Sequence, residues 1–369
     1  MSEATSTPQL GWILTRSPCG PGEAALTITG GPGYRVFNMI NLAEGNINNL
    51  TIARGDVSTN VNDNLGGGVR SFAALSMTNV TVRDCKALSG GGIYSRGYLK
   101  LTNAKIRMNQ AVGNIAMGGG IQASGGYFTM SGGEIDSNSS DQNSGGLDLD
   151  CGATLDKVSI ARNTAANFDG GGLTIESATT AISNSTIGRG NKALNGKGGG
   201  ISVIGGLKLY QSTVAENEAF QGGGIYVADS GTVDSKSSTI GYNTGATNGG
   251  GINIQMGGTV QIVNTAVFGN SAPNGPDILG TVTSGGTNLI ETDAGSNGWV
   301  ASDLRNRAAN FTPLGAWGGP TETCVPIRGS PAIDAGNNAA VPFSDGDQRG
   351  DGFIRIVNER VDIGAVEKQ

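Results

Sequence analysis

The sequence predicts an all-β protein, a single right-handed parallel β-helix of about ten coils with a C-terminal cap. Three observations support this prediction. A glycine cluster followed by a short alternating run recurs along the chain, and an asparagine recurs with the same spacing. Glycine contributes 64 of the 369 residues and proline only 11, without the Gly-x-y period of collagen. Regularly spaced Ile, Val and Leu give such a chain enough apolar surface to bury a long, narrow core.

The glycine repeat has intervals of 24 to 28 residues and comprises eight copies, which begin at Gly66, Gly90, Gly118, Ser144, Gly170, Gly198, Gly222 and Gly249. Each interval holds two further short runs of alternating apolar and polar residues, such as YLKLTN (98–103) and AKIRMN (104–109). Such runs are typical of half-buried strands. Three short strands per unit indicate a β-helix coil, because a propeller blade needs four strands and about 40 residues. Crossover chirality favours the right hand.

The glycines are expected to serve a bend where neighbouring backbones approach closely. A phosphate-binding loop is not indicated, because the sequence contains no GxxxxGK[ST] motif.

The second repeat places an asparagine at the end of the third strand of each coil, at Asn109, Asn138, Asn163, Asn191, Asn217, Asn243 and Asn270. Asparagine tolerates left-handed backbone, and its amide can bond to the same residue one coil away. The spacing therefore predicts an internal asparagine ladder. Cys85 occupies this position in the first clear coil and is expected to be buried.

The ends of the chain differ from its middle. Residues 1–24 are expected to form a lead-in and residues 25–290 the β-helix. Residues 291–369 lose the glycine period and gain proline, tryptophan and charge. Because a solenoid with an open end exposes a strand edge, this last segment is predicted to fold back as a cap.

Composition excludes several classes of function. The chain has no histidine, which rules out a Ser-His-Asp triad and every histidine-ligated metal site. Its net charge of −6 predicts no nucleic-acid partner. No apolar stretch is long enough to span a membrane, and residues 1–23 do not form an intact secretory signal.

The cysteines show no CxxC pair, so a zinc ribbon is excluded; they are Cys19, Cys85, Cys151 and Cys324. Two disulfides are allowed by count, but the repeat places Cys85 and Cys151 about 14 Å apart, beyond disulfide reach. We expect most of these cysteines to be buried and none to be catalytic.

The C-terminal third carries a family resemblance. Its runs NTAVFGNSAPNGPDILGTVTSGGTNLI (264–290), GGPTETCVPIRGSPAIDAG (318–336) and DQRGDGFIRIVNERVDIGAVE (347–367) resemble those of bacterial choice-of-anchor Q domain proteins. Those proteins are right-handed parallel β-helices of the pectate-lyase-like superfamily. The repeats are also similar to those of chlamydial polymorphic outer-membrane proteins.

The resemblance implies a secreted or cell-surface protein and fixes no catalytic residues. Such proteins usually carry an anchoring segment after this run, and we expect both that anchor and the export signal to be absent from this chain. Cys324 stands where family members commonly have histidine.

Two rows of side chains are predicted to point outward from the strand after each glycine cluster, about 4.8 Å apart along each row. The first row is Arg70, Tyr94, Gln122, Asp148, Thr174, Ser202, Tyr226 and Asn253. The second row is Phe72, Arg96, Ser124, Asp150, Glu176, Ile204, Ala228 and Gln255.

One acidic cluster lies on these rows. Asp148, Asp150 and Glu176 are the candidate catalytic residues, with Asp169 in the turn before the Glu176 strand. Carboxylates this close raise one another's pKa and can supply an acid and a base without histidine, at a spacing that inverting glycosidases use. The same oxygens could instead bind Ca²⁺, the one cofactor that the sequence suggests. A third alternative is a solvated acidic face that deters edge pairing.

The candidate ligand-binding residues are Tyr94, Arg96, Gln122, Asp169, Tyr226 and Asn253. An amphipathic strip suited to stacking against sugars and hydrogen bonding to them consists of Tyr94, Tyr226, Phe72 and the amides Gln122, Asn253 and Gln255. Packing of the aromatic residues against a neighbouring loop explains the pattern equally well. A separate loop, DGDQRGD (345–351), offers Asp345, Asp347 and Asp351, but Arg349 interrupts the calcium-loop pattern. A structural Asp347–Arg349 pair is expected there.

These features lead to one preferred function and one alternative. The preferred function is a secreted or cell-surface adhesin-like module that binds a polysaccharide, a cell-surface glycan or another partner. The alternative is a carbohydrate-active enzyme, either a polysaccharide lyase or an inverting glycoside hydrolase, that uses the acidic cluster. The sequence does not set an oligomeric state.

Overall fold

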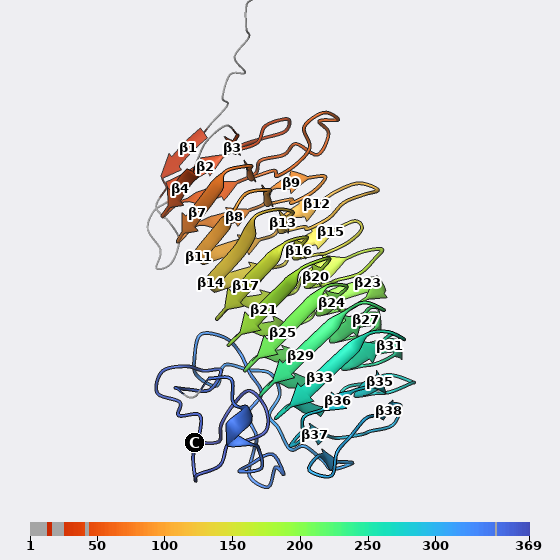
Figure 1. Cartoon of the computed structure of the whole chain (residues 1–369). Coiled ribbons are helices and arrows are strands. Elements are labelled where there is room, and N and C mark those ends of the chain that lie inside the picture. Colours follow the sequence, from red (N-terminus) through yellow and green to blue (C-terminus); the bar gives the residue numbers. More distant parts are fainter. Residues whose placement is uncertain (1–12, 17–25, 41–43, 344) are drawn as a thin grey trace, which may run out of the picture.

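The structure, a computed structural model, describes residues 13–16, 26–40, 44–343 and 345–369, and they form a parallel β-solenoid of about ten coils (Figure 1). Within these residues the single helix is the 3-10 turn η1 (Asn338–Ala340). The predicted all-β solenoid is therefore confirmed. The predicted lead-in, apart from residues 13–16, lies outside the described residues.

Sheet C contains the strand that follows each glycine cluster. Its strands are β3 (Phe37–Met39), β6 (Val69–Ser71), β10 (Ile93–Ser95), β13 (Ile121–Ala123), β16 (Leu147–Leu149), β20 (Leu173–Ile175), β24 (Ile201–Val203), β28 (Ile225–Val227), β32 (Ile252–Ile254), β35 (Ile278–Thr281) and β38 (Ser296–Asn297). Because all of these strands pair in parallel, equivalent residues of successive coils lie side by side.

Sheet A contains the next two strands of each coil, which are fused in β11 and β14. The first of the two strands is β4 (Glu44–Asn48), β7 (Ala74–Thr78), β11 (Leu99–Arg107), β14 (Tyr127–Asp136), β17 (Gly152–Asp156), β21 (Thr179–Ser183), β25 (Gly206–Tyr210), β29 (Thr232–Lys236), β33 (Thr259–Val263) and β36 (Thr283–Ser284). The second is β2 (Leu26–Thr29), β5 (Thr51–Ala53), β8 (Thr81–Arg83), β18 (Ser159–Ala161), β22 (Thr186–Gly188), β26 (Thr213–Ala215), β30 (Thr239–Gly241), β34 (Ala266–Phe268), β37 (Leu289–Ile290) and β39 (Leu304–Arg305). β1 (Ile13–Arg16) pairs with β2 in the antiparallel sense at the N-terminal edge of this sheet.

Sheet B is short and closes the coil before the next glycine cluster. Its strands are β9 (Lys86–Ala87), β12 (Gln110–Ala111), β15 (Ser139–Ser140), β19 (Thr164–Ala165), β23 (Lys192–Lys197), β27 (Glu218–Gln221) and β31 (Thr244–Asn248). The core lies between the three sheets. Leu99 and Leu101 of β11 are fully buried while Lys100 between them is exposed, as the alternating pattern predicts. Each buried Leu or Ile contributes about 1.5–3 kcal/mol to folding.

The glycine clusters allow adjacent coils to approach closely. The first residue of each cluster has a left-handed backbone, with φ of +58° at Gly90 and +57° at Ser144. A Cβ added to the second glycine, Gly119, would lie 2.2 Å from the Ser139 carbonyl oxygen of the next coil. A Cβ on the third, Gly120, would lie 3.0 Å from the Asn138 amide. The predicted structural role of the glycines is therefore confirmed.

The predicted asparagine ladder is also confirmed. Asn163 donates from its backbone N–H and its Nδ2 to Asn191 Oδ1, each at 3.0 Å, and Asn191 Nδ2 donates to Asn217 Oδ1 at 2.9 Å. The same pattern continues to Asn270, whose Nδ2 donates to Asp277 Oδ1 at 2.9 Å. The left-handed conformation, however, lies at the residue before each ladder asparagine, such as Arg162 with φ of +55°.

A second polar ladder, which the sequence did not reveal, lies at the turn between the two strands of sheet A. The backbone N–H of Ser185 donates to Ser212 Oγ at 3.2 Å. Nearer the C-terminus the Thr265 N–H donates to Asn288 Oδ1 at 3.0 Å. Asn288 Nδ2 then donates to Asp303 Oδ1 at 2.9 Å, so this ladder also ends on an aspartate.

The C-terminal segment lies beside the lower coils, against the outer side of sheet A (Figure 1). Before it, β38 and β39 extend the parallel pairing as far as Arg305. A second apolar cluster joins this segment to the coils, and in it the Phe268 and Phe311 rings stack with centroids 4.4 Å apart. Gln348 is fully buried and donates to Thr186 Oγ1 at 3.0 Å. The predicted capping of the open end stays a prediction.

The cysteines agree with the prediction where they are described. Cys85, Cys151 and Cys324 are buried free thiols. Cys85 occupies the predicted ladder position, and its N–H donates to Asn109 Oδ1 at 3.1 Å. Burial raises the pKa of the Cys85 thiol to about 12, which keeps it protonated and unreactive. Cys19 lies outside the described residues.

Candidate functional site

The first predicted row has the predicted register on sheet C. Tyr94, Gln122 and Asp148 are aligned partners on β10, β13 and β16, and the alignment continues through Tyr226 to Asn253. Their exposure differs from the expected outward-facing row, because Tyr94, Asp148, Tyr226 and Asn253 are all buried. The row is in register but does not form an open face.

The residue immediately before each glycine cluster covers this row. These covering residues include Met117, Asn143, Asp169, Lys197 and Gln221. Lys197 Nζ donates to the Tyr226 hydroxyl at 3.1 Å and lies 4.7 Å from the centre of its ring. Asn253 Nδ2 donates to Gln221 Oε1 at 3.4 Å. Tyr226 and Asn253 are thus packed against the last residues of β23 and β27, where a neighbouring loop was the alternative for the aromatic residues.

Asp148 is held inside this covered row. Its Oδ2 accepts a hydrogen bond of 2.7 Å from the Ser144 hydroxyl, which also lies 2.7 Å from Thr174 Oγ1. Gln122 Nε2 approaches Asp148 Oδ1 at 3.5 Å. Burial raises the pKa of Asp148 to about 6, and the hydrogen bonds from Ser144 and Gln122 oppose that rise. Because Asp148 is buried, its carboxylate is not part of a solvated acidic face.

The second row provides the accessible carboxylates. Asp150 is exposed and accepts a hydrogen bond of 2.8 Å from the Ser177 hydroxyl. Glu176 is half-buried on the next coil, where its N–H donates to the Leu149 carbonyl at 2.8 Å. Burial raises the pKa of Glu176 to about 7, and the charges of Asp148, Asp150 and Asp169 add to this effect.

The structure therefore brings together the four carboxyl groups that the sequence singled out. Near neutral pH a Glu176 with a pKa of about 7 can hold or release a proton, while Asp150 lies beside it in solvent. Asp169 is half-buried and accepts a hydrogen bond of 2.9 Å from the Lys197 N–H. The pair of Glu176 and Asp150 could give a general acid and a charged acceptor on one face.

A cationic and aromatic group lies on the same face, toward the N-terminal coils. The exposed ring of Phe72 has the Arg70 guanidinium 5.3 Å and the Arg96 guanidinium 5.9 Å from its centroid. Tyr94 meets Phe72 edge to face at 6.3 Å. Arg96 is exposed, whereas Tyr94 is buried beneath the group. Phe72, which the sequence placed in the strip but not among the site residues, is the most accessible aromatic of this group.

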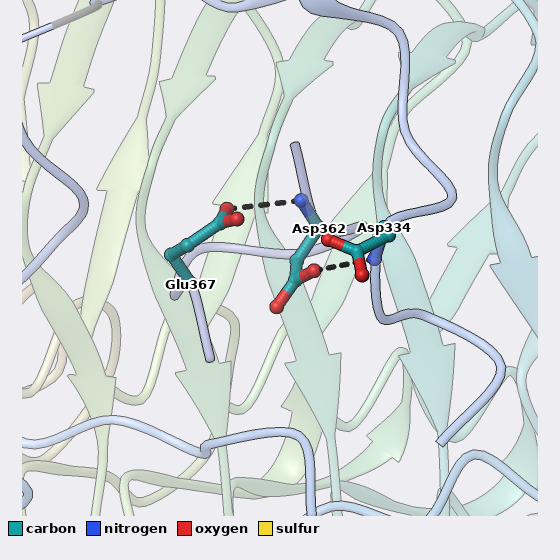
Figure 2. Close-up of side chains that lie close together, drawn as sticks. All are labelled: Asp334, Asp362 and Glu367. Carbon is teal, nitrogen blue, oxygen red and sulfur yellow. Dashed lines mark hydrogen bonds between the residues drawn. The ribbon is translucent and has the colours of Figure 1, made fainter. Parts of the chain in front are cut away.

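A compact acidic group lies elsewhere, in the C-terminal segment. Asp334, Asp362 and Glu367 are the one set of three described acidic residues whose ligand atoms all lie within 4.8 Å of one another (Figure 2). Asp148, Asp150 and Glu176 do not converge this closely. All three residues lie in the C-terminal runs of the sequence, but the group is not visible there, because only folding brings residues 334 and 362 together.

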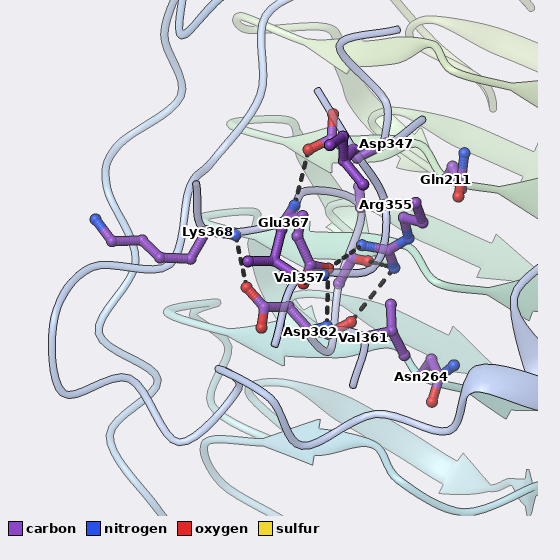
Figure 3. Close-up of polar contacts among 12 residues, drawn as sticks. Gln211, Asn264, Asp347, Arg355, Val357, Val361, Asp362, Glu367 and Lys368 are labelled. Carbon is purple, nitrogen blue, oxygen red and sulfur yellow. Dashed lines mark hydrogen bonds and ion pairs between the residues drawn. The ribbon is translucent and has the colours of Figure 1, made fainter. Parts of the chain in front are cut away.

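Backbone donors and an arginine satisfy the compact acidic group (Figure 3). The Asp334 N–H donates to Asp362 Oδ1 at 2.6 Å, and the Asp362 N–H donates to Glu367 Oε2 at 2.9 Å. The fully buried Arg355 donates to the same Glu367 oxygen at 3.3 Å. These contacts join residues 334, 355, 362 and 367 of the C-terminal segment. The Arg355 guanidinium supplies positive charge to this acidic group.

The DGDQRGD loop has the structural pair that the sequence predicted. Arg349 Nη2 lies 2.6 Å from Asp347 Oδ2, and both side chains are buried. The Glu367 N–H donates to the same Asp347 oxygen at 2.8 Å, which joins the loop to the last residues of the segment.

The fold defines the chain as a parallel β-solenoid repeat protein. Neither a protein-family model nor a curated protein matches the sequence. Among the described residues, no helix has the length and apolar character needed to cross a membrane.

Proposed function

We propose that the protein is a secreted or cell-surface adhesin-like module that binds a glycan, or a partner that carries one, on the outer side of sheet C. The exposed Phe72 ring, with the exposed Arg96 guanidinium 5.9 Å from its centroid, is the observation that carries this proposal, while the second guanidinium, Arg70, is paired with Asp63. Exposed aromatic rings stack on sugar C–H faces, and arginine donors bind hydroxyl or acidic groups. Asp150 and Glu176 extend the same row with acceptors.

We further propose that the chain is a choice-of-anchor Q protein of the pectate-lyase-like superfamily. The quoted C-terminal runs support this assignment, because residues from them form one buried network: Gln348, the Asp347–Arg349 pair and Glu367. An extracellular or cell-surface location follows from the same resemblance.

A glycan array tests the binding proposal. The unmodified protein is expected to bind at least one acidic or neutral glycan, and both Phe72→Ala and Arg96→Met are expected to weaken that binding at least about tenfold. Tyr127→Ala is the matched control, because Tyr127 is 40% exposed on β14 of sheet A, outside the sheet C face. Binding that is unchanged in both site variants would overturn the proposal.

The second candidate function is a carbohydrate-active enzyme, a polysaccharide lyase or an inverting glycoside hydrolase. The observation that favours it is Glu176, half-buried among acidic neighbours with a pKa of about 7, beside the exposed Asp150. In this proposal Asp148 supports the pair from beneath, and Ca²⁺ bound by Asp148, Asp150 and Glu176 is the cofactor alternative.

The test of this candidate is incubation with a panel of acidic and neutral polysaccharides, with and without millimolar CaCl₂. Product formation that Asp150→Asn and Glu176→Gln abolish would support the enzyme. A calcium-dependent rise in the melting temperature that these variants lose would support the metal. No product and no calcium response would remove both.

A further inference from the structure

A pocket lies between sheet A and a strap formed by residues 339–343. It is on a different face of the molecule from the sheet C site. The strap follows η1, which lies beside the lower coils in Figure 1. The pocket has a volume of about 510 Å³, and its lining includes Tyr210, Lys236, Gln261 and Phe343. None of these residues belongs to the sheet C face.

Successive coils build the floor of this pocket. Tyr210, Lys236 and Val263 are aligned partners at the ends of β25, β29 and β33, so their side chains stack along the solenoid axis. Gln261, two residues before Val263, is exposed at the side of the same floor. The parallel pairing fixes these side chains about 4.8 Å apart from coil to coil.

The strap forms the opposite wall and is anchored to the coils. The Asn337 N–H donates to Asn264 Oδ1 at 2.8 Å, and Asn264 Nδ2 donates back to the Asn337 carbonyl at 2.9 Å. The Phe343 ring meets Tyr210 edge to face, with centroids 6.4 Å apart and planes at 70°. Because the Asn337–Asn264 hydrogen bonds and the Phe343–Tyr210 contact hold the strap against sheet A, the pocket is already formed in the unliganded protein.

Tyr210 and Lys236, two polar residues of the pocket, both contact the carboxylate of Asp234. The Tyr210 hydroxyl donates to Asp234 Oδ2 at 2.7 Å, and Lys236 Nζ lies 3.4 Å from the same oxygen. Burial and the bond to Asp234 raise the pKa of Tyr210 to about 12, so the phenol stays neutral. An ammonium group has three N–H donors, and Asp234 occupies one of them. Gln261 adds a donor and an acceptor.

We propose that this pocket binds a neutral pyranose ring, either a monosaccharide or the end unit of a glycan. Two aromatic rings at a steep angle, together with Val263 and Pro342, offer apolar surface to the C–H face of the sugar. Lys236 supplies donors, and Gln261 supplies both a donor and an acceptor, for vicinal hydroxyl groups. Because Asp234 balances the charge of Lys236, the pocket favours a neutral sugar over an acidic one.

The proposal is independent of the sheet C site, and different variants test it. Saturation-transfer NMR is performed with methyl glucoside, methyl galactoside and methyl N-acetylglucosaminide, and with glucuronate and benzyl alcohol as comparison probes. At least one neutral glycoside is expected to bind, with a Kd on the order of millimolar. Phe343→Ala and Gln261→Ala are each expected to weaken this binding by about tenfold.

Two control variants distinguish this pocket from other surfaces. Lys100→Met changes an exposed lysine of sheet A outside the pocket, and Tyr127→Ala changes an exposed aromatic residue of sheet A outside the pocket. Both are expected to leave glycoside binding unchanged. The proposal is overturned if no neutral glycoside binds, if only glucuronate or benzyl alcohol binds, or if the two pocket variants keep full binding with an intact circular dichroism spectrum.

Discussion

At Glu176, burial and the neighbouring carboxylates act in the same direction on the bound proton. The folded protein therefore holds this proton more tightly than the unfolded chain does. Asp148 behaves alike, because its burial also raises its pKa, to about 6. At both residues the folded structure is most favourable when the carboxyl group is neutral.

This arrangement predicts a pH-dependent stability. Glu176 has a pKa of 4.5 in the unfolded reference and about 7 when folded, so between these values the folded state binds more protons. The free energy of unfolding therefore falls as the pH rises through this window. Glu176→Gln should remove this loss, so that the variant melts higher than the parent at pH 8 and close to it at pH 4.5.

Differential scanning calorimetry between pH 4.5 and pH 8 measures the effect. Glu134→Gln on sheet A is the control and should show no comparable gain at pH 8. An equal offset between parent and Glu176→Gln at every pH would contradict the coupling.

Single residues also mark where the sequence did not predict the site. Asp150 and Glu176 were predicted to be neighbours on adjacent coils because register follows from the glycine repeat, and Leu149 and Ile175, the residues before them, are paired. The burial of Asp148 and Tyr226 was not predicted. The residues that cover the first row of sheet C all precede a glycine cluster but differ in side-chain type, as Met117, Asp169 and Lys197 illustrate. No periodic pattern of one residue type therefore revealed them.

Among the elements, the strands and their turns were predictable because each one repeats. The third glycine of a cluster and the ladder asparagine belong together: a Cβ at Gly172 would lie 3.2 Å from the Asn191 amide. The absence of a side chain at the third glycine leaves space for the asparagine amide, and for this reason the glycine and asparagine repeats have the same period.

Removing one ladder amide is expected to be costly. Asn191→Ala deletes the acceptor of the Asn163 N–H and Nδ2 and also the donor to Asn217 Oδ1. Because these groups are buried, the variant should lose about 3 kcal/mol of unfolding free energy. Chemical denaturation measures the loss. Asn195→Ala, an exposed asparagine of the same coil, should lose less than about 0.5 kcal/mol. Similar losses in the two variants would mean that the ladder adds little.

At the scale of the whole molecule, the solenoid was predictable and the position of the C-terminal segment was not. The coils depend on neighbours about 26 residues apart, a spacing that the sequence displays. The packing of the C-terminal segment against the coils depends on contacts such as those of Gln348 with Thr213 and Thr186. No repeat in the sequence indicates these contacts.

Gln348 provides a test of that side packing. Its amide bonds to both the coils and the segment, including Ser185, Thr186, Thr213, Thr321 and Thr323. Gln348→Ala should speed amide hydrogen exchange in residues 306–369 at least about tenfold and leave the strands of sheet C protected. Gln369→Ala, an exposed glutamine of the same segment, is the control. Uniform exchange across both regions would show that the segment and coils open together.

Both internal ladders end on an aspartate, Asp277 for the asparagine ladder and Asp303 for the turn ladder. Along the asparagine ladder the side-chain amides point their N–H groups toward the C-terminus, so their dipoles add and the positive end lies at the last coils. In the turn ladder the Asn288 amide points the same way. A carboxylate there complements that dipole, and since an ionised carboxylate has no N–H or O–H it passes no donor onward. The two aspartates thus end the two side-chain ladders, while the parallel strand pairing continues as far as Arg305.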